Sequence, residues 1–379
     1  MARIIYALSG QGRGHTSRVM AISDALRQRG HTVRFCCGGT AREVLEAAGE
    51  RVVPVPALRQ VLHGNELRFW ATGLENARTV AARPAIVERL ADAFQAFAPD
   101  LLITDFEAFS PRAAARIGLP VLSFNHQQVL TETAYDLSPR RWLQALLAFA
   151  IIRMIVPKDP AHVLLTSFFF PPLKHPERTT LVPPIIRPAV KALTPSTGEH
   201  VLVYYNTPEG TQHVLDALRE VDARFIVYNF DPPPDAARYP NIVFKQPCLD
   251  GFLADLASSR AVICTAGFTL ISEALYLGKP LLVVPNGGIF EQTLNAIFLK
   301  REGLGEAVME RALTADDVAA FLARRDAYAA QLDGRPACGN DAAVACIEAV
   351  LARHAAPPPA AEAPLPASNG AVGTGQEIV

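Results

Sequence analysis

The sequence predicts an α/β protein of two Rossmann-like domains, each built on a parallel sheet. Short apolar runs, of the kind that form buried parallel strands, alternate with helical patterns along both halves of the chain. Between the halves, residues 191–199 contain Thr, Ser, Pro and Gly, which is typical of a linker. With 379 residues, the chain is long enough for each half to bury a core of its own.

Composition narrows the class of protein. The 36 Lys and Arg residues nearly balance the 37 Asp and Glu residues, so nothing in the overall charge indicates a nucleic-acid partner. No apolar run is long enough to span a membrane, and the run at the N-terminus is too short for a signal peptide. The six cysteines lack C-x-x-C spacing, which favours free thiols in a reducing compartment. We therefore expect a cytoplasmic protein.

The first expected strand, Arg3–Leu8, runs into a glycine-rich loop of the form G-x-G-x-G-H-x-x-R, and a helix follows. The dinucleotide fingerprint fails, because His15 stands where its third glycine belongs and the next strand ends without an acid for a ribose. NAD binding is therefore not indicated. A neutral imidazole can take a proton from an acceptor group, so His15 is our candidate general base; a bracing role in the loop is the alternative.

The remainder of the first half is expected to continue the alternation. Residues 58–76 are expected to contain a loop in which Trp70 is available to an acceptor, and one long helix is expected to follow to about residue 97. The strand at residues 101–104 ends at Asp105, and Ser110 is expected to cap a helix that begins at Pro111. The strand at residues 120–124 ends at the segment Asn-His-Gln-Gln, which contains His126.

Residues 140–158 form an unusually apolar segment, bracketed by Arg140, Arg141, Arg153 and Lys158. Aromatic, aliphatic and basic residues combine in this way in helices that lie at a membrane surface. A helix that is apolar nearly all round is more commonly a buried core helix. We favour the core helix and keep peripheral membrane contact as the alternative.

The second half is organised around residues 261–299. The pattern predicts a strand, a helix after Gly267, the strand Leu281–Val284, a polar loop and a second helix from Glu291. Two helix N-termini therefore open beyond the carboxyl ends of neighbouring strands, where open α/β sheets bind ligands. Free N–H groups and the helix dipole favour an anion there, such as a pyrophosphate. Glu273, about two turns into the first helix, can accept hydrogen bonds from a vicinal diol such as a ribose.

The series G-x-T-x-x-S-E-x-x-x-x-G-x-P, followed by E-Q-x-x-N-A, resembles the donor half of GT-B nucleotide-sugar glycosyltransferases. It is similar in particular to the peptidoglycan N-acetylglucosaminyltransferase and its relatives. The matching residues are Gly267, Thr269, Ser272, Glu273, Gly278, Pro280, Gln292, Asn295 and Ala296. The loop around His15 resembles the first loop of the same group, where the histidine is a proposed general base.

The resemblance covers roughly residues 3–350 and implies the GT-B architecture, two Rossmann-like domains that face each other across a cleft. It implies inverting transfer of a sugar from a nucleoside diphosphate sugar, usually UDP-linked, to a hydroxyl or amine of an acceptor. No cofactor is expected, and because the sequence contains no Asp-x-Asp, no metal is expected either. The sequence leaves open whether the nucleotide is UDP or dTDP, which sugar is transferred and what the oligomeric state is. It also leaves open whether the acceptor is a small molecule or a lipid-linked compound. A nucleotide-sugar 2-epimerase of the same fold and a catalytically silent nucleotide-sugar-binding module are the alternatives.

The site expected from the resemblance draws on both halves. The candidate donor-binding residues are Gly12, Gly14, Arg187, Asn206, Thr207, Lys245, Gln246, Gly267, Phe268, Thr269, Glu273, Gly287, Gly288, Glu291 and Gln292. The candidate acceptor contacts are Asp105, His126, Gln128 and Trp70. His126 and Gln128 correspond to a His-acid-Gln segment of the resembled group, although Gln127 replaces the acid, and a structural role for the histidine is the alternative. Residues 206–210 depart from the glycine-rich loop of that group.

The expected domain boundaries follow from these elements. Residues 1–190 form the acceptor domain, 191–199 the linker and 200–333 the nucleotide-sugar domain. Residues 334–354 are expected to form a C-terminal helix that returns to the first domain. Residues 355–379 are rich in Pro, Ala, Gly and Ser and are expected to be disordered.

Overall fold

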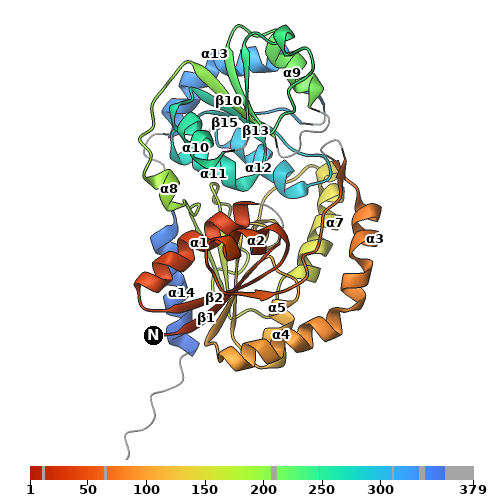
Figure 1. The fold of residues 1–379 in the computed structure, drawn as a ribbon, viewed down its shortest axis with the longest axis vertical. Helices are drawn as coiled ribbons and strands as arrows, with labels where there is room; N and C mark the ends of the chain where they lie inside the picture. The colour runs from red at the N-terminus through yellow and green to blue at the C-terminus, as the bar shows by residue number, and fades with distance from the viewer. Residues whose placement is uncertain are drawn as a thin grey trace, which may run out of the picture.

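Two parallel sheets, one in each half of the chain, form the framework of the protein (Figure 1). The structure, a computed structural model, describes residues 1–10, 13–63, 66–205, 211–246, 248–309, 311–332 and 338–354. The first sheet has the order β3-β2-β1-β6-β7-β8-β9 and the second the order β12-β11-β10-β13-β14-β15. In both, the first strand of the domain lies at the point where the strand order reverses, which is the doubly wound arrangement. The predicted pair of Rossmann-like domains is confirmed.

The first domain alternates strands and helices up to the linker. Its elements are β1 (Arg3–Leu8), α1 (Arg13–Gln28), β2 (Thr32–Cys37), α2 (Gly39–Ala47), β3 (Val52–Pro54), the hairpin β4 (Leu62–His63) and β5 (Glu66–Leu67), α3 (Phe69–Ala81), α4 (Arg83–Phe97), β6 (Leu101–Asp105), α5 (Ser110–Arg116), β7 (Val121–Asn125), α6 (Val129–Glu132), α7 (Pro139–Ile155), β8 (His162–Thr166) and β9 (Thr179–Val182).

The second domain follows the short helix α8 (Pro188–Lys191). Its elements are β10 (His200–Tyr204), α9 (Gln212–Arg219), β11 (Arg224–Tyr228), the 3-10 helix η1 (Ala236–Arg238), β12 (Ile242–Lys245), α10 (Leu249–Ser258), β13 (Ala261–Thr265), α11 (Phe268–Tyr276), β14 (Leu281–Val284), α12 (Phe290–Arg301), β15 (Gly305–Ala307) and α13 (Ala315–Leu332). The strands and helices expected around residues 261–299 are therefore present, with Gly278 in the left-handed conformation (φ +68°) where α11 ends.

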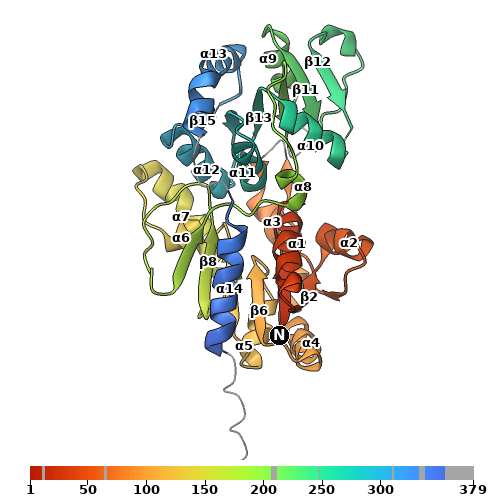
Figure 2. The same ribbon diagram turned by 90° about the vertical axis from the view of Figure 1, so that its left-hand side faces the viewer.

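The last helix, α14 (Asn340–His354), packs against the first domain rather than the second (Figure 2). Its buried residues, among them Val344 and Ile347, share one hydrophobic cluster with β1 and α1. At its start, the Asn340 side chain accepts a hydrogen bond from the backbone N–H of Ile186 (2.9 Å) and donates one to the Ile186 carbonyl (2.8 Å). This amide pair fixes the point at which the chain re-enters the first domain.

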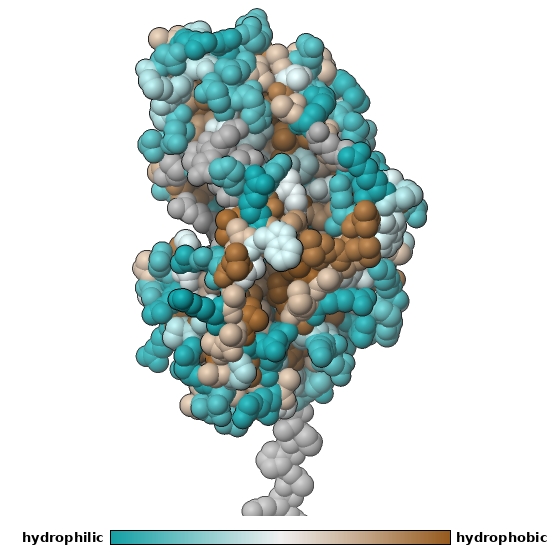
Figure 3. Space-filling view, turned by 90° about the vertical axis from the view of Figure 1, so that its right-hand side faces the viewer, coloured by the Kyte–Doolittle hydropathy of each residue, from teal (hydrophilic) through white to brown (hydrophobic). Residues whose placement is uncertain are grey.

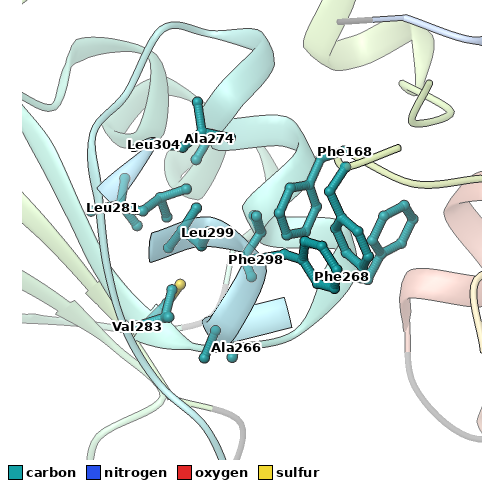
Figure 4. Packing of buried hydrophobic residues seen from close by; sticks show 14 of the residues in the cluster. Phe168, Ala266, Phe268, Ala274, Leu281, Val283, Phe298, Leu299 and Leu304 are labelled. Carbon is teal, nitrogen blue, oxygen red and sulfur yellow. The ribbon is translucent and has the colours of Figure 1, made fainter. Parts of the chain in front are cut away.

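A second hydrophobic cluster crosses the boundary between the domains (Figure 4). Phe168 and Phe169 follow β8 in the first domain, and Phe268 and Phe298 belong to α11 and α12 in the second. The rings of Phe169 and Phe298 stack with centroids 4.0 Å apart, and those of Phe168 and Phe268 lie 6.3 Å apart. Because aromatic side chains bury large apolar areas, this contact holds the two domains against each other.

Two local expectations for the first domain are wrong. The long helix expected before residue 97 is two helices, α3 and α4, which meet at Ala82. Pro84 stands in the first turn of α4, where the backbone N–H groups have no partner within the helix, so its missing N–H costs nothing there. The same proline cannot continue the preceding helix α3, because it lacks the N–H that a helix interior requires. Ser110 does not cap α5; instead, the buried Glu107 carboxylate accepts hydrogen bonds from the backbone N–H groups of Phe109 and Ser110.

The preference for a core helix at residues 140–158 is also wrong. Of the side chains of α7, only Ala145 and Ile152 are buried, while Leu143 is 72% exposed. Figure 3 shows hydrophobic residues gathered across the middle of the face of the molecule on which α3 and α7 lie. Within the described residues, no helix combines the length and the apolar character that crossing a membrane requires. The segment is therefore a surface helix with apolar residues in solvent.

Asn340→Ala is expected to lower the free energy of unfolding by about 2 kcal/mol, because it leaves the buried N–H and carbonyl of Ile186 without partners. Urea denaturation measures this change. Asp341→Ala, one residue along at an exposed position of the same helix, is the control and should cost well under about 1 kcal/mol. Equal effects of the two substitutions would contradict the anchoring role of Asn340.

Candidate functional site

The centre of the candidate site in the first domain is a buried carboxylate with two partners. Asp105 ends β6, and its side chain has no exposed surface. Arg18 of α1 donates to both carboxylate oxygens, with Nη2 2.6 Å from Oδ2 and 2.7 Å from Oδ1. The Nδ1 atom of His15 lies 2.9 Å from Oδ1, and this side chain keeps 16% of its surface exposed. His15, Arg18 and Asp105 thus form one cluster with only the imidazole open to solvent.

The charge of Asp105 is stabilised by its two partners, Arg18 and His15. Burial by itself would raise the pKa of Asp105, but Arg18 and His15 outweigh it and hold the pKa of the carboxyl below its ordinary value. The same atom Nδ1 of His15 also lies 3.1 Å from Nη2 of Arg18, a longer contact than the one to the carboxylate. An ionised carboxylate next to Nδ1 favours the tautomer with the proton on Nδ1, which leaves Nε2 as the basic nitrogen.

In the second domain, Glu273 of α11 is paired across the domain boundary with Arg187, which precedes α8. Nη2 of Arg187 donates to Oε2 at 2.8 Å, and Nε lies 2.7 Å from Oε1. Burial raises the pKa of Glu273, and the guanidinium opposes that shift. Two of the candidate donor-binding residues, Arg187 and Glu273, therefore lie together as an ion pair, with the guanidinium on one side of the carboxylate.

His126 lies between the domains and is buried, with contacts on both ring nitrogens. Nδ1 lies 2.8 Å from the carbonyl oxygen of Thr166, and Nε2 lies 2.8 Å from Oδ1 of Asn295 on α12. Its ring stacks on Phe268 with centroids 3.8 Å apart. Burial lowers the pKa of His126, against the effect of Glu291 and of these hydrogen bonds. In this structure His126 and Phe268 thus join the domains, which favours the structural alternative over direct contact with a ligand.

The N-termini of α1 and α11 meet at Gly14 and Thr269. A Cβ atom at Gly14 would lie 2.4 Å from Oγ1 of Thr269, so this position has no room for a side chain. A Cβ atom at Gly267, the N-cap of α11, would meet nothing within 4 Å. Two helix N-termini from different domains therefore converge beside open space, and both favour an anion.

The loop that contains Gly287 and Gly288 contacts the hairpin of the first domain. The backbone N–H of Leu67 donates to the carbonyl of Gly287 at 2.9 Å, and Glu66 pairs with Gly287 as a parallel bridge. Gly288 has φ +77° and a Cβ there would lie 3.2 Å from Leu67, so only glycine fits without strain. These two glycines therefore serve close packing between the domains at this point.

The other predicted site residues are placed as follows. Gln292 is buried and its Oε1 accepts from the backbone N–H of Asn286 (2.8 Å), which braces the loop, whereas Glu291 is partly exposed at the start of α12. Gln128 is buried among Ser123 and Asn125, so it braces the end of β7 instead of facing a ligand. Trp70 on α3 is 90% exposed, and Gln246 is also exposed. Lys245 forms an ion pair with Asp255, with Nζ 2.6 Å from Oδ2. Gly12, Asn206 and Thr207 lie outside the described residues.

The structure changes the interpretation of Asp105 and adds residues that the sequence did not single out. Asp105 is too buried to contact an acceptor, and it orients His15 instead. Arg18 was visible only as the last residue of the loop motif. Thr16 Oγ1 and Asn286 Nδ2 are buried atoms without a hydrogen-bond partner among the described residues. A buried polar atom without a partner is costly, so both atoms suit hydrogen bonds to a bound ligand.

Comparisons of the sequence place these features among known proteins. The family described as glycosyl transferase family 1 matches residues 2–325. An uncharacterized glycosyltransferase of Methanosarcina mazei is 24% identical over 334 residues, which are 80% of this chain and 84% of that protein. The UDP-N-acetylglucosamine–N-acetylmuramyl-(pentapeptide) pyrophosphoryl-undecaprenol N-acetylglucosamine transferase of Nitratidesulfovibrio vulgaris is 25% identical over 388 residues, 93% of this chain and 97% of that protein.

Solved structures share the architecture. UGT2 of Phytolacca americana, in complex with UDP-2-fluoro-glucose and pterostilbene, superposes with a TM-score of 0.68 at 15% identity, over 93% of this chain and 99% of that one. MurG of Acinetobacter baumannii gives a TM-score of 0.62 at 14% identity, over 92% of this chain and 100% of that one. At such identities the similarity shows the fold alone, which is GT-B, as the sequence predicted.

Arg187→Ala is expected to destabilise the protein by about 3 kcal/mol near neutral pH, because the buried Glu273 carboxylate loses its cation. The cost should shrink in mild acid. Burial raises the pKa of Glu273 in the folded state, so between its unfolded and folded pKa values the folded variant holds a proton that the unfolded chain has released. The stability of the variant therefore falls as the pH rises through this interval, and the cost of the substitution is smaller below it. Urea denaturation at mildly acidic and at neutral pH measures both values.

The matched control is Arg42→Ala, which removes the exposed Arg42–Glu46 pair and should cost at most about 0.5 kcal/mol at either pH. A cost for Arg187→Ala that does not change with pH would contradict the pairing with Glu273.

Proposed function

The chain belongs to glycosyl transferase family 1, and from this we propose that it transfers a sugar, with inversion, from a nucleoside diphosphate sugar to a hydroxyl or amine of an acceptor. That it is a glycosyltransferase follows from the family; inversion, a UDP-linked donor and independence of a metal are the proposal. The observation that carries it is the contact of 2.9 Å between His15 and the buried Asp105, at the edge where the two domains meet.

The cluster supplies the base that inversion requires. In a single displacement, the acceptor loses its proton as its oxygen or nitrogen attacks the anomeric carbon from the face opposite the leaving diphosphate. Asp105 accepts the Nδ1–H of His15 and leaves Nε2 free to take that proton. When the imidazole becomes charged, the carboxylate stabilises it, while Arg18 keeps the carboxylate ionised and in place. The exposed part of His15 is where an acceptor can reach it.

The donor is proposed to lie with its diphosphate at the meeting point of α1 and α11. Two helix N-termini favour the negative charge of the leaving group without a metal, in agreement with the lack of an Asp-x-Asp motif. Thr16 Oγ1 and Asn286 Nδ2, which have no hydrogen-bond partner in the part of the chain that the structure describes, are suited to donate hydrogen bonds to the nucleotide sugar. We expect no cofactor beyond this co-substrate.

Glu273 is proposed to hold the ribose of the nucleotide. A carboxylate has about four lone-pair sites, so it can accept from a diol while Arg187 stays on its other side. The acceptor is either a small molecule or a lipid-linked compound, as in the name of the Nitratidesulfovibrio vulgaris relative. The proposed location is the cytoplasm, at the inner face of the membrane when the acceptor is lipid-linked.

His15→Ala is expected to lower turnover by on the order of 100-fold or more, since the attacking group loses its base, while UDP binding measured by calorimetry stays unchanged. His213→Ala, at an exposed position of α9, is the control and should leave both unchanged. Unchanged turnover in His15→Ala would contradict the role of His15 as the general base. Formation of an epimer from the nucleotide sugar alone would indicate the epimerase instead.

Glu273→Ala is expected to weaken UDP binding by about 1–3 kcal/mol, because the ribose hydroxyls lose their acceptor. Calorimetry with UDP measures the change, and thermal unfolding of the variant verifies that the fold survives. Glu220→Ala, an exposed position in the same domain, serves as the control. Wild-type affinity in Glu273→Ala would mean that the ribose lies elsewhere.

A further inference from the structure

The surface helix α7 has its apolar side in the solvent. Leu143, Leu147 and Met154, spaced four and seven residues apart, are 72%, 47% and 62% exposed. An amphipathic helix of a soluble protein normally presents polar residues to water and apolar ones to the core. In α7 the two buried positions are Ala145 and Ile152, so much of the large apolar surface faces outward. Such a side is typical of a helix that meets another apolar phase.

The helix α3 lies on the same face of the molecule and has no buried residue (Figures 1 and 3). It exposes 90% of Trp70 and 78% of Leu74. An isolated helix of 13 residues is marginal in water, because most helix stability comes from packing of an apolar side. We define the apolar face as the exposed apolar side chains of α3 and α7: Phe69, Trp70, Leu74, Val80, Trp142, Leu143, Leu146, Leu147 and Met154.

A basic pocket lies at the end of α7 and at the start of α4, the helix that directly follows α3. It has a volume of about 540 Å³ and lies where the start of α4, the helix α5 and the end of α7 come together. Its lining residues are Arg83, Pro84, Val87, Arg112, Arg116, Arg153, Met154 and Lys158, which include five cations and no carboxylate. Arg116 makes an exposed ion pair with Glu88 at 3.6 Å, which neutralises little of the positive charge of the pocket.

The guanidinium of Arg112 lies within this pocket and donates to the carbonyl oxygens of Ala108 and Met154. These bonds tie α5 to the end of α7 and hold the pocket in shape. Burial, and then the charge of Arg83, lower the pKa of Arg112, as expected where cations face one another. An anion in the pocket would relieve this repulsion.

We propose that the apolar face and the basic pocket together dock the protein on a bilayer that contains anionic phospholipid. The apolar side chains of α3 and α7 enter the boundary between head groups and acyl chains, and the pocket takes the phosphate groups of the lipids. Charge favours a bilayer over a second copy of the chain. A symmetric dimer through this face would bring two basic pockets of the same sign towards each other, whereas an anionic surface complements them. Docking goes beyond the sugar transfer and does not depend on it.

The test is flotation of the full chain with vesicles of phosphatidylcholine, with and without phosphatidylglycerol, at low and high salt. The protein should float with the anionic vesicles at low salt, and less at high salt, because salt screens the exposed charges. Soluble glycerol phosphate should not compete at the concentration of the lipid head groups, since it lacks the apolar part. Release of the protein by glycerol phosphate at that concentration would mean a free-phosphate site and would overturn the docking proposal.

Two pairs of substitutions separate the parts of the surface. Arg83→Glu with Arg153→Glu should weaken vesicle binding by about 30-fold or more, which corresponds to about 1 kcal/mol for each lost cation. Leu74→Ser with Leu143→Ser should weaken it at both salt concentrations, since the apolar term is not screened. The control is Arg238→Glu in the second domain, with an exposed side chain, which should bind like the wild type.

All variants should keep the thermal unfolding transition of the wild type, which shows that they are folded. Their affinity for UDP in calorimetry tests the proposed function separately from docking. No flotation of the wild-type chain with anionic vesicles would overturn the proposal. A wild-type dimer in light scattering that Leu74→Ser with Leu143→Ser dissociates, without vesicle binding, would identify the face as an interface between copies and overturn it as well.

Discussion

The buried carboxylate of Asp105 is the constraint on which the first domain's share of the site depends. An ionised carboxylate inside a protein is costly unless it is paired and hydrogen-bonded. Because β6 pairs with β1, Asp105 lies beside Leu8, directly before the glycine-rich loop, and α1 carries Arg18 and His15 back to it. The need of one charge for partners thus fixes the first turns of α1 and the orientation of the imidazole.

The second domain is tied to this arrangement by several kinds of contact at one boundary. An ion pair joins Arg187 to Glu273, and a hydrogen bond joins His126 to Asn295. The ring of His126 also stacks on Phe268, which belongs to the hydrophobic cluster at the boundary. Gly14 and the loop at Gly287 allow backbone to approach where a side chain would clash. Residues that the family resemblance connects with ligands therefore hold the domains together in this structure.

The outer surface of the first domain differs from the cores in that it exposes large apolar side chains. The cores beneath both sheets bury their apolar residues almost completely, yet α3 and α7 keep Trp70, Leu74 and Leu143 in water. Leaving such side chains exposed forgoes the free energy that burial would supply. Side-chain hydrogen bonds hold α3 to the preceding loop, because the Asn76 amide donates to the carbonyl of Arg59 and Thr72 Oγ1 accepts from the backbone N–H of Val61.

The sequence by itself determined the alternation of strands and helices and the two parallel sheets, and it singled out His15 and Glu273 as candidate site residues. These depend on periodicity and on glycines and prolines at short range, which the chain displays directly. Only the tertiary structure decided the partners, because Asp105 stands 90 residues from His15 and Arg187 stands 86 residues from Glu273. It also decided that α7 is a surface helix. A helix that is apolar nearly all round has the same pattern in a core and at an interface, and burial depends on what the rest of the chain places against it.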